Sequence, residues 1–487
     1  MTDIQLVDVS IRDGNQSLWG ATGLSTPQVL QIAPVLNRVG FRALDFTSST
    51  AMGVSVRTFR ENPWERIRLV HAAMPDTRLQ LIGTGFRFIS WEAMHPDMLQ
   101  LVYNRLVVNG VTRFVVLDPM HDMDAVRRTA RMIRSAGGEE IVGALTFTIS
   151  AVHDDAFYAD LADQMAACPD IDRVYVKDPA GLVTTERAAT LFPALLARLG
   201  DTPLELHSHC TIGNSPRTYL AAARLGVQAL QVACGPLANG TSLPDAHRVV
   251  ANLRELGYTV DIDDHALDLV AAYFHRLARA NGLPVGRPQE YDAAFEHHQV
   301  PGGVITTLKR HLAEVGLAEK FDAVMAETGQ VRAELGYPIM VTPFPQLVCT
   351  QALYNVIGDG RYATVPDEVI RYALGTFGRP TAPIEPEVLD RIMSRPRARE
   401  LAAEPPPPGP AELRKRFRPG IDDEELLLRA AMPAEQVDAM LAAGPVRRGY
   451  NPELGPLLEL LRELRDRPDV TDLVVQRPGL RVELRRG

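Results

Sequence analysis

Short apolar runs alternate with longer amphipathic stretches along the first part of the chain. Eight runs are predicted strands, at residues 5–9, 43–46, 79–83, 113–117, 141–149, 173–176, 204–208 and 229–232. Apolar residues recur at helical spacing between them, for example over 26–39, 63–73 and 185–199. The runs are largely apolar rather than alternating, which is typical of parallel strands covered on both sides. Eight such units over roughly 280 residues predict an α/β fold, the TIM (β/α)8 barrel.

The loop after the first predicted strand distinguishes between two candidate folds, the barrel and a doubly wound sheet. A doubly wound sheet that binds a dinucleotide carries a glycine-rich loop there. This chain instead continues with Ser10-Ile-Arg-Asp-Gly-Asn-Gln-Ser17. The barrel is therefore the favoured fold.

Helical patterns dominate beyond Pro284. They cover residues 303–314, 318–335, 344–357 and 367–374, and after a proline-rich linker near 404–410 also 422–431 and 433–443. The last residues predict a helix over 451–466 and a hairpin of strands 472–476 and 480–485 around Arg477-Pro-Gly. We therefore expect a barrel domain at 1–285, a mainly helical C-terminal domain at 286–443 and a short helix-hairpin tail at 444–487.

Composition and charge exclude several classes of function. Hydrophobic residues make up 46% and charged residues 23% of the 487 residues, the balance of a globular protein. The net charge of −9 and the lack of a basic stripe predict no nucleic-acid partner. No apolar stretch approaches the ~20 residues of a membrane span, and no targeting signal precedes the first strand, so we expect a cytoplasmic protein. The four cysteines are widely scattered and predict reduced thiols.

The strongest local signal for chemistry is His207-Ser-His209 at the end of the seventh predicted strand. Residues two apart on a strand share a face, so both imidazoles can point to one centre at the C-terminal mouth, where barrel active sites lie. Asp13 closes the first predicted strand at the same mouth. One carboxylate and two imidazoles suit Zn, Co or Mn. Taken alone, each of these residues also has a purely structural interpretation.

Arg12 and Lys177 bring charge to the same end of the barrel. Arg12 can neutralise the oxyanion that develops when a carboxyl group leaves a 2-oxo acid. An ammonium at Lys177 would be repelled by a cation, so the lysine is either neutral or converted to a carbamate that acts as an oxygen ligand. The structural alternative is a lysine paired with Asp178 or Asp118.

At this point the motifs resemble a family, the biotin-dependent carboxyltransferases. The family includes the oxaloacetate decarboxylase alpha subunit, the carboxyltransferase domain of pyruvate carboxylase and the keto-acid subunit of transcarboxylase. The similar segments begin with Ile11-Arg-Asp-Gly-Asn-Gln-Ser17, Glu61-Asn-Pro-Trp-Glu-Arg66, Thr148-Ile-Ser-Ala-Val-His153 and Lys177-Asp-Pro-Ala-Gly181. They continue in the same order with His207-Ser-His209, Val300-Pro-Gly-Gly303, Leu335-Gly-Tyr-Pro338, Val341-Thr-Pro343 and Thr350-Gln-Ala352. The resemblance covers about residues 3 to 440.

The resemblance implies a role for each matching residue. It implies a divalent metal held by Asp13, carbamylated Lys177, His207 and His209. It also implies that Arg12 and Gln16 bind the 2-oxo acid and its enolate, and that Thr342 relays a proton between enolpyruvate and biotin. The expected activity is carboxyl transfer or decarboxylation on a 2-oxo acid such as oxaloacetate or pyruvate.

Several positions depart from the family pattern. Thr84, in Ile82-Gly-Thr-Gly85, replaces the arginine of Leu-Leu-Arg-Gly that binds the substrate carboxylate; Arg87 is a possible substitute. Thr47-Ser-Ser-Thr50 replaces Trp-Gly-Gly-Ala and makes that wall more polar, and Asn15 replaces a histidine. Pro345 replaces a serine that contacts carboxybiotin and has neither hydroxyl nor amide hydrogen.

Partners and two alternative functions complete the expectations. The chain contains no Ala-Met-Lys-Met sequence, so any carboxybiotin arrives on a separate carrier protein. The tail resembles the segment before the biotinyl domain in carrier proteins, or it helps to form a homodimer or larger oligomer. A related acyl-CoA lyase or Claisen-type synthase, with Asn239 as a metal ligand, is one alternative. A non-catalytic scaffold subunit is the other.

Overall fold

The computed structural model describes residues 3–85, 87–90, 93–450, 471–477 and 480–485. The chain divides into two compact units, Met1–Arg447 and Arg448–Gly487. The first unit holds the barrel, the helices around it and the helical segments that follow.

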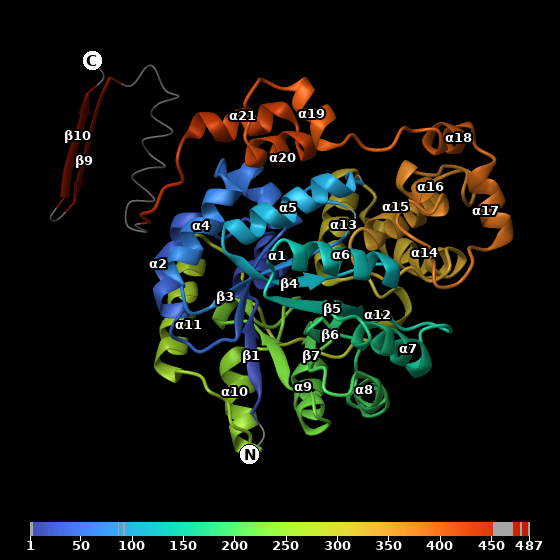
Figure 1. The fold of residues 1–487 in the computed structure, drawn as a ribbon, viewed down its shortest axis with the longest axis horizontal. Helices are drawn as coiled ribbons and strands as arrows, with labels where there is room; N and C mark the ends of the chain where they lie inside the picture. Colours follow the sequence, from blue (N-terminus) through green and yellow to red (C-terminus); the bar gives the residue numbers. More distant parts are fainter. Residues whose placement is uncertain (1–2, 86, 91–92, 451–470, 478–479, 486–487) are drawn as a thin grey trace. The chain divides into compact units, whose positions relative to one another are not determined.

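Eight parallel strands close into a barrel in chain order, as Figure 1 shows near the centre of the first unit. They are β1 (Gln5–Asp8), β2 (Ala43–Ser48), β3 (Arg78–Gly83), β4 (Val111–Val116), β5 (Glu140–Thr146), β6 (Arg173–Asp178), β7 (Leu204–Ser208) and β8 (Ala229–Val232). β1 pairs with both β2 and β8, so the barrel leaves no strand edge open. The predicted TIM barrel is confirmed.

Helices cover the outside of the barrel. The main ones are α2 (Thr26–Leu36), α4 (Pro63–Ala73), α5 (Pro96–Val108), α6 (Met123–Ser135), α7 (Asp155–Ala166), α8 (Thr185–Leu199), α9 (Ser215–Arg224), α10 (Ala246–Glu255) and α11 (Asp264–Ala280). Their starts are capped locally: the Asn62 side chain accepts hydrogen bonds from the amides of Trp64 and Glu65 at the start of α4. The predicted bounds of 63–73 and 185–199 match α4 and α8.

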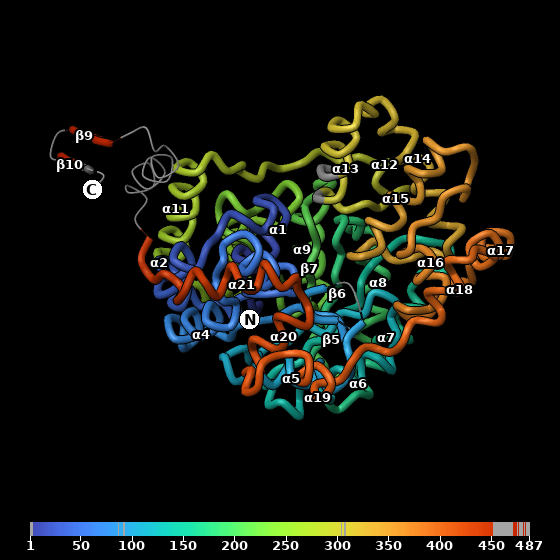
Figure 2. The backbone as a smooth tube through the Cα atoms, turned by 90° about the horizontal axis from the view of Figure 1, so that it is seen from above, coloured from blue at the N-terminus to red at the C-terminus, as the bar shows by residue number. Residues whose placement is uncertain are grey.

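A mainly helical region follows the barrel, as predicted. It comprises α12 (Ala294–His298), α13 (Gly302–Glu314), α14 (Phe321–Glu334), α15 (Phe344–Ile357), α16 (Asp367–Ala373), α17 (Pro386–Met393) and α18 (Pro396–Ala402). Figures 1 and 2 both show α14 to α18 gathered at one side of the barrel, around an apolar core that includes Val324, Phe344 and Ile370. Ile339 and Val341, just before α15, pack against Val115, Val142 and Tyr175 of the barrel strands. This contact brings the start of α15 to the barrel mouth.

The chain then returns to the barrel wall through α19 (Pro410–Arg416), α20 (Asp423–Ala431) and α21 (Ala434–Ala443). Glu424 at the start of α20 accepts a hydrogen bond from Asn109 Nδ2 at 2.8 Å and pairs with Arg68 at 2.9 Å. These bonds tie α20 to the barrel helices α4 and α5.

The second unit contains an antiparallel hairpin of β9 (Asp472–Arg477) and β10 (Leu480–Arg485), which confirms the predicted tail strands. The helix predicted over 451–466 lies outside the described residues. The domain bounds predicted at 285 and 443 stay predictions. Among the described helices, none has the length and apolar character that crossing a bilayer requires.

Candidate metal and substrate site at the barrel mouth

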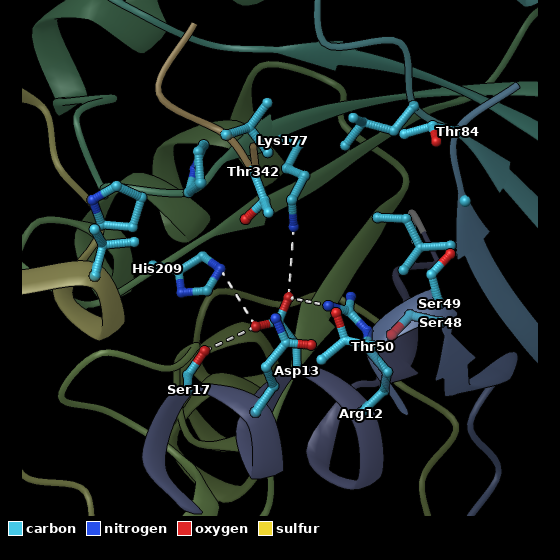
Figure 3. A pocket seen from close by; sticks show the side chains of 18 of the residues that line it. Arg12, Asp13, Ser17, Ser48, Ser49, Thr50, Thr84, Lys177, His209 and Thr342 are labelled. Atoms are coloured by element: carbon cyan, nitrogen blue, oxygen red, sulfur yellow. Dashed lines mark hydrogen bonds and ion pairs between the residues drawn. The ribbon is translucent and has the colours of Figure 1, made fainter. Parts of the chain in front are cut away.

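A cavity of about 340 Å³ opens at the C-terminal ends of the strands, under the segment that leads into α15. Almost all the residues that the sequence singled out line it, namely Arg12, Asp13, Gln16, Thr84, Arg87, Lys177, His209 and Thr342. His207 is fully buried and contacts the lining residues Lys177 and His209. Figure 3 shows side chains that reach the cavity from several different segments, namely Arg12, Asp13, Thr84, Lys177, His209 and Thr342. The structure therefore brings the predicted site residues together.

Arg12 and Asp13 reach the cavity from a helical turn and not from a strand. β1 ends at Asp8, and a π-helical turn, Ser10–Gly14, follows before α1 (Asn15–Trp19). The prediction that Asp13 closes the first strand was therefore wrong. The turn is held by the Asp8 carboxylate, which accepts hydrogen bonds from the amide and hydroxyl of Ser10. Ser17, one turn further, donates its hydroxyl to Asp13 Oδ1 at 2.9 Å.

Asp13 and the two histidines form a compact group of ligand atoms. Asp13 Oδ2 lies 3.2 Å from His207 Nε2, and Asp13 Oδ1 lies 3.6 Å from His209 Nε2. The two Nε2 atoms are 3.1 Å apart, and the three residues offer ligand atoms within 4.8 Å of one another. Burial lowers the pKa of His207 to about 3, so its imidazole is neutral, the form that binds metals. The group fits a divalent cation with nitrogen and oxygen ligands.

The amine of Lys177 lies beside the ligand atoms of Asp13 and the two histidines. Its Nζ is 2.9 Å from His207 Nε2 and 3.4 Å from Asp13 Oδ2. Burial lowers the pKa of this amine, although Asp13 partly opposes the shift. The alternative partners are occupied elsewhere: Asp178 accepts from Ser208 and from the amides of Leu182 and Val183. Asp118 accepts from the amides of Met120 and Asp122. The pairing of Lys177 with Asp178 or Asp118 was therefore wrong.

A row of side chains crosses three neighbouring strands beside this lysine. Thr146 on β5 is in register with Lys177 on β6, which is in register with His207 on β7. Residues in register on parallel strands point to the same face. The Thr146 hydroxyl is buried and has no hydrogen-bond partner among the described residues. A buried polar group of this kind calls for a partner.

Arg12 is held between two carboxylates. Its Nη1 lies 2.8 Å from Asp13, and its Nε donates to Asp45 Oδ2 at 2.7 Å. Burial alone would raise the pKa of Asp13, but Arg12, His209 and Lys177 outweigh it and hold that pKa well below its usual value. Asp45 was missed in the sequence, although an acid inside the apolar strand Leu44-Asp-Phe46 was a signal. The pairing fixes the guanidinium at the cavity wall.

The wall formed after β2 and β3 is polar, as the sequence predicted. Ser48, Ser49, Thr50 and Thr84 line it together with Arg87. Figure 3 shows Ser48, Ser49 and Thr84 on the side of Arg12 away from His209. Burial lowers the pKa of Arg87 to about 10, so this side chain still carries its charge at neutral pH. The cavity therefore has a polar wall on the side of Arg12 away from His209.

The segment before α15 forms the opposite wall. Thr342 lines the cavity, and so does Gln346, which sequence reasoning missed. Phe344 and Pro345 are buried in the first turn of α15. The replacement of the serine by Pro345 therefore leaves the Thr342 hydroxyl at the cavity.

Comparisons with known proteins agree with this fold and identify related proteins. A family model described as a conserved carboxylase domain matches residues 296–443. A pyruvate carboxylase subunit of Methanocaldococcus jannaschii is 33% identical over 396 residues, covering 80% of this chain and 68% of the relative. The methylmalonyl-CoA carboxyltransferase 5S subunit of Propionibacterium freudenreichii subsp. shermanii is 26% identical, covering 88% of this chain and 86% of that subunit.

Solved structures agree on the fold. A variant of the carboxyl transferase domain of Rhizobium etli pyruvate carboxylase, with pyruvate, matches with a TM-score of 0.83 at 22% identity. The match covers 99% of this chain and 84% of that domain. The chain spans 43% of the complete multifunctional pyruvate carboxylase of the same organism.

Proposed function

The chain belongs to the biotin-dependent carboxyltransferase family, and we propose that it transfers a carboxyl group to or from a 2-oxo acid at its barrel mouth. The observation that carries the proposal is the convergence of Asp13, His207 and His209 beside Lys177 at one wall of the cavity. The family membership expected from the motifs is confirmed by the relatives. Since those relatives are named as carboxylase and carboxyltransferase subunits, the scaffold alternative has lost its support.

We propose that Asp13, His207, His209 and carbamylated Lys177 hold a divalent ion, Zn, Co or Mn. The donor set fits these ions, since it offers two imidazole nitrogens and carboxylate-type oxygens. Such an ion supplies Lewis-acid polarisation of the substrate oxo group. The unpartnered Thr146 hydroxyl supports the carbamate, because the modification would place an oxygen acceptor beside it.

The residues around the proposed ion have distinct tasks. Arg12 is fixed by Asp13 and Asp45, so its charge is already oriented when negative charge develops on the oxo oxygen during C–C bond cleavage. Gln16, from α1, lines the same cavity and binds the 2-oxo acid beside Arg12. The Thr342 hydroxyl can both donate and accept, and it relays the proton between the enolate carbon and biotin.

The carboxylate of the 2-oxo acid contacts the polar wall. Thr84 offers a hydroxyl there, and Arg87 offers a charge. These two residues replace the single arginine that the family pattern predicts. The oxaloacetate and pyruvate type of 2-oxo acid is the expected substrate class.

Biotin and a partner complete the proposal. Carboxybiotin arrives on a separate biotin carboxyl carrier protein and enters beside Thr342 and Gln346. The protein works as a homodimer or larger assembly, in the cytoplasm.

The lyase or synthase alternative finds less support. Asn239 adopts a left-handed backbone conformation in the turn after β8, and its amide donates to the Leu243 carbonyl. It is not among the described residues that line the cavity, whereas Lys177 is. The carbamate separates the two functions, because the alternative has no use for it. A carbon-13 carbamate signal after exposure to labelled CO2, lost in Lys177→Arg, is expected for the carboxyltransferase.

Oxaloacetate decarboxylation by the full chain tests the function. We expect activity that depends on added Zn, Co or Mn and that increases with a biotinylated carrier protein. Thr342→Ala should lose most of the carrier-dependent rate. Thr342→Ser keeps the hydroxyl and should therefore retain most of that rate. Inactivity of the metal-loaded protein on every β-carboxy-2-oxo acid tested would remove the proposal.

A further inference from the structure

A chain of buried polar side chains runs from the centre of the barrel to His207. Glu205, on β7, accepts from Arg113 Nη2 at 2.5 Å and from Arg173 Nε at 2.6 Å through its Oε1. Its Oε2 accepts from Gln231 Nε2 at 3.3 Å, and Gln231 Oε1 lies 2.7 Å from His207 Nδ1. Glu205, Gln231 and His207 are all almost fully buried, so water does not compete for these bonds.

The order of donors and acceptors along this chain has only one consistent solution. A carboxylate between two arginines is ionised and can only accept hydrogen bonds. The Gln231 group that faces Glu205 must therefore be the NH2 group. The amide oxygen then faces His207, and an amide oxygen only accepts. His207 Nδ1 must therefore carry the hydrogen, which leaves a lone pair on Nε2.

The partners of His207 Nε2, on the other side of the ring, do not determine which nitrogen carries the hydrogen. Its Nε2 is 3.2 Å from Asp13 and 3.1 Å from His209 Nε2, which would both favour a hydrogen on Nε2, and 2.9 Å from Lys177 Nζ, which would favour a lone pair. The partner on the Nδ1 side therefore selects the tautomer. His209 is oriented in the same sense, because its Nδ1 lies 2.7 Å from the Thr241 carbonyl oxygen, an obligate acceptor.

We propose that Gln231 is a positioning residue that fixes His207 in the Nδ1–H tautomer, and that Glu205 in turn fixes the amide orientation of Gln231. The Nε2 lone pair of His207 then faces Asp13 before any ion is bound. The importance of this arrangement for metal binding rests on the proposed function, but the tautomer is a property of the metal-free protein. Partners that orient metal-bound histidines typically change metal affinity about 10–100-fold when they are removed.

Nitrogen-15 NMR of the histidine-labelled, metal-free full chain at neutral pH measures the tautomer directly. We expect the wild-type protein to show His207 with the hydrogen on Nδ1. Gln231→Met removes the acceptor, so the tautomer with hydrogen on Nε2, donating to Asp13, should appear. Zinc affinity, measured by competition with a chelator, should fall about 10–100-fold.

Gln80→Met is the matched control. Gln80 on β3 is also almost fully buried and contacts Arg113 in the same network, but no bond joins it to His207 among the described residues. It should leave the His207 tautomer and the zinc affinity unchanged. Equal effects of the two variants would overturn the proposal and indicate a purely structural role for Gln231.

The wild-type spectrum keeps the proposal testable if Gln231→Met does not fold. An Nε2–H tautomer of His207 in that spectrum would overturn it. An Nδ1–H tautomer in a protein that binds no metal would support the positioning role and contradict the proposed metal site, so the two failures are distinguishable.

Discussion

At the scale of single residues, Thr84 is one of the two positions proposed to contact the substrate carboxylate. It lines the polar wall, and its hydroxyl is buried without a hydrogen-bond partner among the described residues. A hydroxyl gives a neutral hydrogen bond, which stabilises a complex by about 0.5–1.5 kcal/mol, whereas an arginine gives a charged one of about 1.5–3 kcal/mol. A carboxylate that contacted Thr84 alone would therefore be bound less strongly than one that contacted the arginine of the family pattern.

Two substitutions at Thr84 should move the KM for oxaloacetate in opposite directions. Thr84→Arg adds a charge and should lower KM about tenfold, while Thr84→Val removes the hydroxyl at similar volume and should raise KM about 2–10-fold. Both effects concern ground-state binding, so kcat should change less than KM. Steady-state kinetics on the metal-loaded protein measure both constants. If neither variant changes KM, Thr84 does not contact the substrate.

Individual site residues could be predicted where chemistry and motif coincide. His207, His209 and Lys177 were found because each interrupts or ends an apolar strand, and strand ends meet at one barrel mouth. Asp45 and Gln231 were missed because their contacts are with residues far away in sequence, and Gln346 was missed because only the fold brings it to the cavity. Asp45 in β2 and Gln231 in β8 were visible in the sequence as polar residues inside apolar strands, but the neighbouring residues do not show which buried group each one contacts.

At the scale of elements, the turn between β4 and α6 holds a strained and buried histidine. His121 has a φ of 54°, in the left-handed region, and its Nε2 accepts a hydrogen bond from the Thr146 amide at 2.9 Å. Burial, with a smaller contribution from His153, lowers the pKa of His121 to about 3. The turn therefore requires a neutral imidazole.

This requirement gives the turn a predictable pH dependence. Below pH 6.5 the unfolded chain binds a proton at His121 that the folded chain does not, so stability is lost as the pH falls from 6.5 toward 3. His121→Asn removes this group, and asparagine tolerates positive φ. The free energy of unfolding should therefore fall less steeply with acid in the variant, by up to about 1.4 kcal/mol per pH unit.

Denaturant unfolding at several pH values measures this slope. The comparison isolates His121, because Asp118, whose pKa burial raises to about 6, is present in both proteins. His275→Asn is the control, since it makes the same replacement at an exposed position on α11. The same slope in His121→Asn and wild type would show that this turn accepts a protonated histidine.

Strands and helices were largely predictable, whereas the first loop was not. The predicted bounds of 204–208 and 229–232 match β7 and β8, because buried parallel strands are continuous apolar runs between turns. The strand predicted at 141–149 ends earlier, at Thr146 of β5, because apolar residues continue into the loop. The π-helical turn Ser10–Gly14 has no pattern in the sequence and depends on bonds such as those of Asp8 to Ser10.

At the scale of the whole molecule, the described site residues all lie in the first compact unit, Met1–Arg447. The sequence predicted the barrel, the helical region and the tail hairpin from their patterns. The family resemblance placed Thr342 at the site, but the patterns could not predict the packing of Ile339 and Val341 on the barrel strands that delivers it to the cavity. That contact joins segments about 200 residues apart, and local periodicity carries no information on such pairs.

A chain shortened after Arg447 tests whether the catalytic part is complete without the second unit, Arg448–Gly487. Because the unit that remains is compact and holds the site, metal content and carrier-independent oxaloacetate decarboxylation should stay within about twofold of the full chain. A chain shortened after Met432 is the matched control. It also removes α21, whose Val437 and Met440 are buried, and should unfold at lower temperature. Loss of metal from the chain shortened after Arg447 would show that the second unit helps to stabilise the metal site. If only the carrier-dependent rate falls, the second unit takes part in binding the carrier protein. If sedimentation equilibrium gives a smaller mass for the shortened protein, the second unit contributes to oligomer assembly.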